Sequence, residues 1–217
     1  MSSSTEQVNH THRLDEVTRT VETGRRDGAE TKTVTVTQSY PVSIDELWAA
    51  VTEGERISRW LMPITGDLRL GGRYQLEGNA GGVVERCDQP ESFAVTWEYG
   101  AMMSWLEVRL TATGDGTVLE LVHEAPVDPD TWVKYGPGAV GVGWDLGLMG
   151  LAEHIRTGAP VDPELGMTFP TTSEGQEFIR QAADGWADAA IGAGDEPGVA
   201  RAGAASTFAF YTGIPES

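Results

Sequence analysis

The sequence is poor in cysteine and in basic residues. One cysteine, Cys87, stands among 217 residues, which excludes an intramolecular disulfide. Fifteen Lys and Arg residues accompany 33 Asp and Glu residues, so the net charge is −18 at pH 7. Because so acidic a surface repels phosphate backbones and anionic lipid head groups, we expect neither nucleic acid nor a membrane surface as a partner.

Segments for membrane insertion or secretion are also missing. The most apolar stretch, residues 140–152, is interrupted by Asp145 and is shorter than the roughly 20 residues of a transmembrane helix. The opening Met-Ser-Ser-Ser-Thr-Glu lacks the basic start and apolar core of a signal peptide. We therefore expect no membrane insertion and a cytoplasmic location.

Common catalytic and cofactor motifs are absent as well. The sequence contains no GxSxG elbow, HExxH pair, P-loop or CxxC pair. Residues 136–141 match the GxGxxG dinucleotide pattern, but Pro137 removes a phosphate-binding amide and no βαβ unit follows. His10 and His12 have no further ligands nearby. We predict no cofactor and no metal site.

What the sequence does contain is the pattern of a globular α+β domain. Hydrophobic residues make up 40% and include seven Trp. Residues 1–13 are polar and are predicted to form a disordered tail. Alternating β-branched residues on either side of Gly24–Gly28 predict a hairpin. The capping-box spacing of Ser43–Glu46 predicts a helix start, and residues 55–60 a second short helix.

A long meander and one long helix follow. From Gly66 to Pro126 the period is two, which predicts about five antiparallel strands with one face of large residues. A helix then presents a matching apolar stripe to that face, formed by Trp144, Leu148, Leu151 and Ile155. Five glycines between Gly138 and Gly150 lower its helix propensity, so we expect close packing to stabilise it.

This order of elements resembles the START-like helix-grip superfamily, also called SRPBCC. Within it, the chain looks most similar to homologues of the heat shock protein 90 ATPase activator. The residues that carry the likeness fall within 32–157 and include Ile44–Trp48, Arg59–Trp60, Asp67–Tyr74, Val95–Tyr99, Thr117–Glu124 and Gly143–Trp144. The resemblance implies an α+β fold in which a curved antiparallel sheet wraps around a long C-terminal helix. We expect the START-like domain over 14–159, including the N-terminal hairpin strand, and a helical C-terminal extension over 160–217 packed on it.

A helix-grip fold can leave an apolar space between sheet and helix, where a small molecule binds. The candidate ligand-binding residues are Trp60, Tyr74, Trp97, Tyr99, Trp105, His123, Trp144 and Leu148. The alternative is that these side chains simply fill the core. Our first hypothesis is a non-enzymatic domain that binds an apolar small molecule, with His123 contacting a polar group of the ligand.

Two other functions stay open. The resemblance also implies an interaction module of the chaperone-activator type, with a protein as its partner. Relatives of the fold include polyketide cyclases, so a cyclase- or hydrolase-like enzyme is the third hypothesis. In that case His123 would carry the proton, and a second polar group would face it across the cavity.

Overall fold

The computed structural model describes residues 14–215, so the predicted disordered tail lies outside the described residues. Eight strands of the described chain form one sheet in the order β1-β2-β8-β7-β6-β5-β4-β3, and all neighbouring strands are antiparallel. The strands are β1 (Thr18–Arg26), β2 (Ala29–Tyr40), β3 (Ile64–Gly66), β4 (Arg73–Leu76), β5 (Gly81–Asp88), β6 (Ser92–Tyr99), β7 (Met102–Thr113) and β8 (Gly116–Pro126).

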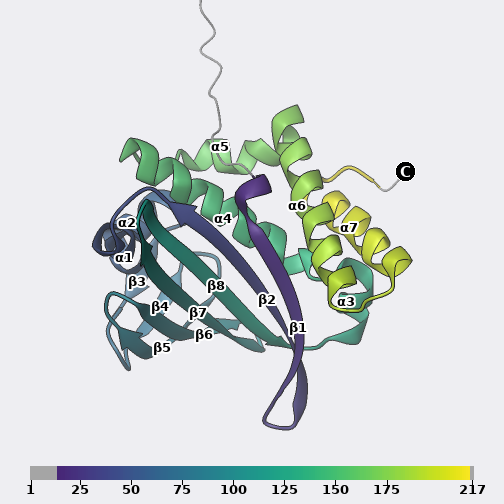
Figure 1. Ribbon diagram of the computed structural model, residues 1–217, viewed down its shortest axis with the longest axis horizontal. Helices are drawn as coiled ribbons and strands as arrows, with labels where there is room; N and C mark the ends of the chain where they lie inside the picture. The colour runs from purple at the N-terminus through teal and green to yellow at the C-terminus, as the bar shows by residue number, and fades with distance from the viewer. Residues whose placement is uncertain (1–13, 216–217) are drawn as a thin grey trace, which may run out of the picture.

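Helices lie against one face and around the rim of this sheet (Figure 1). They are α1 (Ile44–Thr52), α2 (Gly54–Trp60), α3 (Pro129–Tyr135), α4 (Gly138–Thr157), α5 (Pro163–Thr168), α6 (Ser173–Gly192) and α7 (Pro197–Thr212), with 3-10 turns η1 (Leu14–Glu16) and η2 (Phe169–Thr171). α4 crosses the sheet, while α1 and α2 lie at one end, α6 lies beside β1 and α7 packs on α6. None of the helices in 14–215 combines the length and apolar character needed to cross a membrane.

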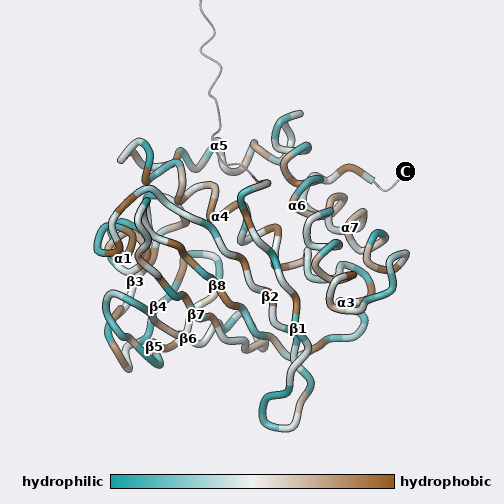
Figure 2. The backbone as a smooth tube through the Cα atoms, viewed as in Figure 1, coloured by the Kyte–Doolittle hydropathy of each residue, from teal (hydrophilic) through white to brown (hydrophobic). Residues whose placement is uncertain are grey.

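The N-terminal hairpin is confirmed. β1 pairs with β2 around Asp27 and Gly28, whose φ angles of 52° and 86° suit a tight turn with right-handed strand twist. This turn projects from the body of the molecule and is hydrophilic (Figure 2). The meander contains six strands rather than about five, because residues 64–66 pair with β4 as the additional strand β3.

The start of α1 agrees only in part with the predicted capping box. Ser43 does accept a hydrogen bond from the Glu46 amide at 3.3 Å. The Glu46 carboxylate, however, accepts from Arg56 at 2.7 Å. At α6 the N-cap is Thr172, whose hydroxyl accepts from the Gly175 amide at 3.0 Å.

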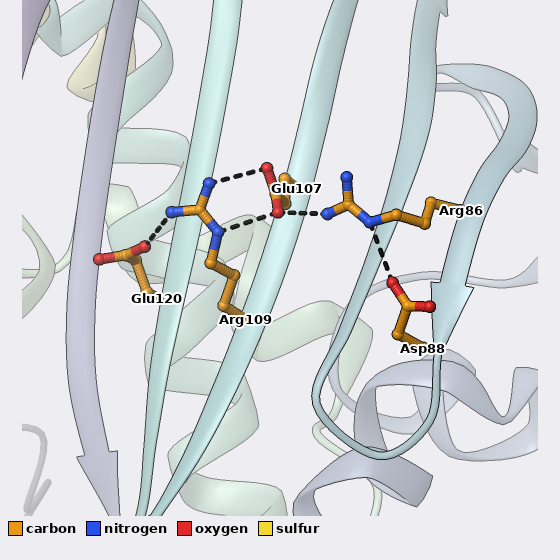
Figure 3. Close-up of polar contacts among 5 residues, drawn as sticks. All are labelled: Arg86, Asp88, Glu107, Arg109 and Glu120. Atoms are coloured by element: carbon orange, nitrogen blue, oxygen red, sulfur yellow. Dashed lines mark hydrogen bonds and ion pairs between the residues drawn. The ribbon is translucent and has the colours of Figure 1, made fainter.

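Charged residues occupy the outer face of the sheet. Figure 3 shows a ladder of ion pairs across β5, β7 and β8. Glu107 contacts both Arg86 and Arg109, and Arg109 also reaches Glu120 at 2.6 Å. The intervening residues of β7 and β8, such as Leu106 and Leu119, are buried on the opposite face. The sheet is therefore solvated on one face and packed on the other.

α4 packs closely against its neighbours through its glycines. A Cβ atom at Gly141 would lie 2.2 Å from the Trp186 ring of α6, and one at Gly150 would lie 2.6 Å from the Trp60 carbonyl oxygen of α2. These separations leave no room for a side chain. The expected close packing of the glycine-rich helix is confirmed.

A buried ion pair joins the C-terminal helices to the sheet and α4. Asp145 of α4 is fully buried and accepts from Arg19 of β1 at 2.9 and 3.2 Å. The Trp186 indole of α6 donates to the same carboxylate at 2.8 Å. α7 adds a hydrogen bond from the Tyr211 hydroxyl to the Ala139 carbonyl at 3.1 Å. Helices α6 and α7 thus pack on the outer side of α4.

Candidate ligand cavity

A cavity of about 460 Å³ lies between α4 and the inner face of the sheet. Side chains of α1, α2, α4 and strands β3–β8 line it, and most of them are aliphatic or aromatic. The wall is apolar because the strand residues that point inward are large hydrophobic residues. The apolar side chains at positions 144, 148 and 151 of α4 face them. Volume and lining fall within the usual range of small-molecule sites.

The structure brings five of the eight candidate residues together at the cavity wall. They are Trp60, Tyr74, Trp97, Trp144 and Leu148. The other three, Tyr99, Trp105 and His123, are not among the residues that line the cavity. Whether any of the five contacts a ligand stays a prediction.

Tyr99 and Trp105 miss the cavity because of their places on their strands. Tyr99 is the last residue of β6 and is 53% exposed beside the turn into β7. On β7 the inward position belongs to Leu106, so Trp105 lies on the outer face, where the Arg26 guanidinium stacks 4.1 Å from the ring centre. Tyr99 is outside the cavity because its strand ends there, and Trp105 because its position on β7 points to the outer face.

His123 points inward as expected, but the protein itself engages both ring nitrogens. The Trp144 indole N–H donates to Nδ1 at 3.0 Å, so the proton of the neutral ring is on Nε2. Nε2 then donates to the Ser104 hydroxyl at 2.8 Å, and that hydroxyl donates to the Trp97 carbonyl at 3.1 Å. Burial lowers the pKa of His123 to about 4, which keeps the ring neutral.

This hydrogen-bonded chain fixes two tryptophans of the cavity wall. The rings of Trp97, His123 and Trp144 pack edge to face, with centroid distances of 5.1–6.0 Å. His123 therefore acts behind the wall, as a positioning residue for Trp144. Trp144 and Ser104 engage the two ring nitrogens of His123, and His123 is not among the residues that line the cavity.

Sequence reasoning missed part of the wall. Trp48 and Phe93 line the cavity and pack edge to face at 6.0 Å. The parity of Phe93, which it shares with Trp97, was the signal that could have found it. Leu68, Arg69 and Leu70 also line the cavity from the loop between β3 and β4, where no periodic pattern exists to reveal them.

Three further polar groups of the wall bond to the backbone. The Tyr74 hydroxyl donates to the Thr96 carbonyl at 2.8 Å, and burial raises the pKa of this phenol, so it stays neutral. The Trp60 indole donates to the Ala50 carbonyl at 2.9 Å, and the Thr52 hydroxyl donates to the Trp48 carbonyl at 2.7 Å. These groups offer a ligand apolar contact more than hydrogen bonds.

The cavity reaches the surface at one end. Its exposed lining residues are Arg69 and Leu70 of the β3–β4 loop, with Cys87 and Gln89 at the end of β5. Leu70 is 66% exposed, which is unusual for a leucine beside an apolar cavity. We call this group of four residues the mouth. Polarity in the lining is thus concentrated where a ligand would meet water.

Known structures resemble the chain to different extents. The solution structure of CalU16 from Micromonospora echinospora is 31% identical, with a TM-score of 0.69, over 82% of this chain and 96% of CalU16. Its crystal structure is 30% identical, with a TM-score of 0.62, over 81% and 98%. MLL2253 from Mesorhizobium loti is 22% identical, with a TM-score of 0.51, over 58% and 98%, and shows the fold alone. No curated protein matches the sequence.

The family match covers the core of the fold. Residues 41–156, more than half of the chain, match the family described as Activator of Hsp90 ATPase homolog 1-like protein. This segment runs from α1 through nearly all of α4, so β1, β2 and the helices after α4 lie outside it. The chain belongs to the Activator of Hsp90 ATPase homolog 1-like family and has its α+β helix-grip fold, as the sequence predicted.

Proposed function

We propose that this protein binds an apolar small molecule in the cavity between α4 and the sheet. The observation that carries the proposal is a space of about 460 Å³ whose interior wall is almost entirely apolar. The chain from Trp144 through His123 to Ser104 supports it, because it holds the wall in place before a ligand arrives. Preformed walls lower the ordering cost of binding.

The hydrophobic effect supplies the affinity in this proposal. Each 100 Å² of apolar ligand surface removed from water contributes about 2.5 kcal/mol. Loss of translational and rotational freedom offsets several kcal/mol of that gain. A molecule must therefore fill most of the cavity to bind in the micromolar range.

A reaction at His123 is the enzymatic alternative. It would need a ring nitrogen facing the ligand, whereas Trp144 and Ser104 engage both nitrogens. The proposal is therefore binding without chemistry at this residue. The family description also raises a chaperone-activator role, in which a protein partner binds independently of the cavity.

A cavity-filling substitution tests the proposal. Leu148 is 2% exposed on α4 and lines the cavity. Leu148→Phe adds volume inside the wall, so we expect the affinity for N-phenylnaphthylamine, an uncharged fluorescent probe, to fall about tenfold, which is 1.4 kcal/mol. Leu121→Phe, from the sheet side, should act likewise. Fluorescence titration measures both.

The matched control is Val199→Phe on α7, where the native side chain is 44% exposed and lies outside the cavity wall. Its affinity for the probe should equal that of the wild type. Thermal unfolding confirms that each variant folds. Absence of saturable probe binding by the wild type, or equal affinities for all variants, would refute the proposal.

A further inference from the structure

The charged groups at the mouth of the cavity bear on which ligands can bind. Arg69 is the one Lys, Arg, Asp or Glu among the described lining residues. Its guanidinium donates to both carboxylate oxygens of Asp67 at 2.8 Å, through Nε and Nη2. Arg69 lowers the pKa of Asp67, so the carboxylate is ionised at neutral pH. The pair is a fork-to-fork contact whose net charge is zero.

The pair leaves the mouth without an unneutralised positive charge for an anion. Exposed acidic residues lie near it in the chain, with Glu53 and Glu55 on either side of Gly54 at the start of α2 and Glu91 two residues after Gln89. Gly54, between the first two, lies against the side chain of Leu68, which precedes Arg69 in the β3–β4 loop. The whole chain adds a net charge of −18. The local field therefore opposes an anionic group.

The interior opposes any charged group. Burying an ion without a partner is far more costly than burying a neutral polar group, and the Tyr74, Trp60, Thr52 and Trp144 groups of the wall already bond to other groups of the protein. Asp67 engages Nε and Nη2 of Arg69, so the Nη1 amino group of this exposed side chain is not used by Asp67 and can donate to an acceptor. A neutral carbonyl or hydroxyl oxygen suits that donor.

We propose, on the basis of the proposed binding function, that the ligand is an uncharged molecule with an apolar, ring-containing body and a neutral oxygen at the end nearest the mouth. The body packs among the tryptophans, and the oxygen accepts from Arg69. Asp67 acts as a specificity-determining residue, because its carboxylate cancels the charge that would otherwise attract anions.

Two probes with the same rings but different charge test this proposal. N-phenylnaphthylamine is uncharged, and anilinonaphthalene sulfonate adds one sulfonate. We expect the wild type to bind the uncharged probe at least about tenfold more tightly. Raising the salt concentration to about 0.5 M, which screens the repulsion, should strengthen binding of the sulfonate and leave the uncharged probe unchanged.

Variants of the ion pair separate charge from hydrophobicity. Asp67→Asn frees the Arg69 charge, so affinity for the sulfonate should rise about fivefold, while affinity for the uncharged probe stays within twofold. Arg69→Gln leaves the Asp67 charge without its partner, so affinity for the sulfonate should fall below that of the wild type. The matched control is Asp188→Asn on α6, which breaks another exposed Asp–Arg pair, with Arg201, outside the cavity wall. It should change neither affinity.

The outcomes distinguish this inference from the proposed function. If neither probe binds, the proposed function fails, and this inference fails with it. If the uncharged probe binds but the sulfonate binds as tightly or more tightly, the cavity binds ligands and only the inference is overturned. Equal gains for Asp67→Asn and Asp188→Asn would likewise overturn it, because the effect would then come from total charge. Arg69→Gln keeps the test valid if Asp67→Asn does not fold.

Discussion

Trp144 owes its place in the cavity wall to His123, which accepts from its indole N–H and is itself only 5% exposed. A neutral histidine suits this position because it donates through one ring nitrogen and accepts through the other. Protonation would place a second donor opposite the Trp144 indole and break the contact. At the scale of single residues, the arrangement thus depends on the charge of one ring.

The pH dependence of stability should report this ring. The pKa of His123 is lowered from an ordinary value near 6.5 to about 4, so below pH 6.5 the unfolded chain takes up a proton that the folded chain does not. Stability therefore falls as the pH falls, by about 2 kcal/mol between pH 7 and pH 5 from this residue alone. Urea unfolding at several pH values measures it.

His123→Gln is the informative variant, since an amide can accept from Trp144 and donate to Ser104 without titrating. It should fold at pH 7 and lose about 2 kcal/mol less than the wild type between pH 7 and pH 5. An unchanged pH slope would show that other groups cause the acid sensitivity.

At the scale of elements, the distance between α4 and its neighbours depends on glycine. Gly141 has no space for a Cβ atom beside Trp186. In contrast, a Cβ atom at Gly192, the last residue of α6, would have no neighbouring atom within 4 Å. Gly141→Ala must push α4 and α6 apart, and we expect a loss of about 1–3 kcal/mol. Gly192→Ala should be neutral or slightly stabilising. Denaturant unfolding of both variants measures the difference, and equal effects would contradict the close contact.

The ion pair of Arg19 and Asp145 ties together three elements, β1, α4 and α6. Burial raises the pKa of Asp145, and Arg19 acts in the opposite direction. Asp145→Asn leaves the Arg19 charge buried without its partner, so we expect a loss of about 3–5 kcal/mol in the free energy of unfolding. Replacing both residues by leucine should recover part of that loss.

The matched control for the buried pair lies on the solvated face of the sheet. Glu107→Gln removes the central carboxylate of the ladder in Figure 3, which is 24% exposed and contacts Arg86 and Arg109. Because solvent screens this network, the expected loss is about 1 kcal/mol or less and shrinks with added salt. A larger loss for Glu107→Gln than for Asp145→Asn would contradict the assignment of Asp145 as a buried link.

Sequence patterns predicted the elements better than the contacts between them. The period of two over the meander and the apolar stripe of α4 were sufficient to predict the strands and the helix, because the two faces of each element differ strongly in polarity. Trp105 shows the limit, since it was a candidate for the cavity wall, whereas its neighbour Leu106 takes the inward position on β7. The short helix α3 escaped prediction although Asp128 caps it and Pro129 opens it, a local signal without an apolar stripe.

At the scale of the whole molecule, the sequence could not decide between a filled core and a cavity. That outcome depends on a few ångströms of separation between α4 and the sheet. Gly150 against α2 and Gly141 against α6 determine where α4 lies, and these contacts join residues far apart in the chain. The mouth escaped prediction for a related reason, because the Asp67–Arg69 turn has no period.

The crystal structure of the complex with N-phenylnaphthylamine tests the central claim most directly. We predict one probe molecule between α4 and the sheet, with its rings within about 4 Å of Trp97 and Trp144. A probe bound only on the outer surface, with the space beneath α4 closed by the side chains of its own wall, would contradict the claim.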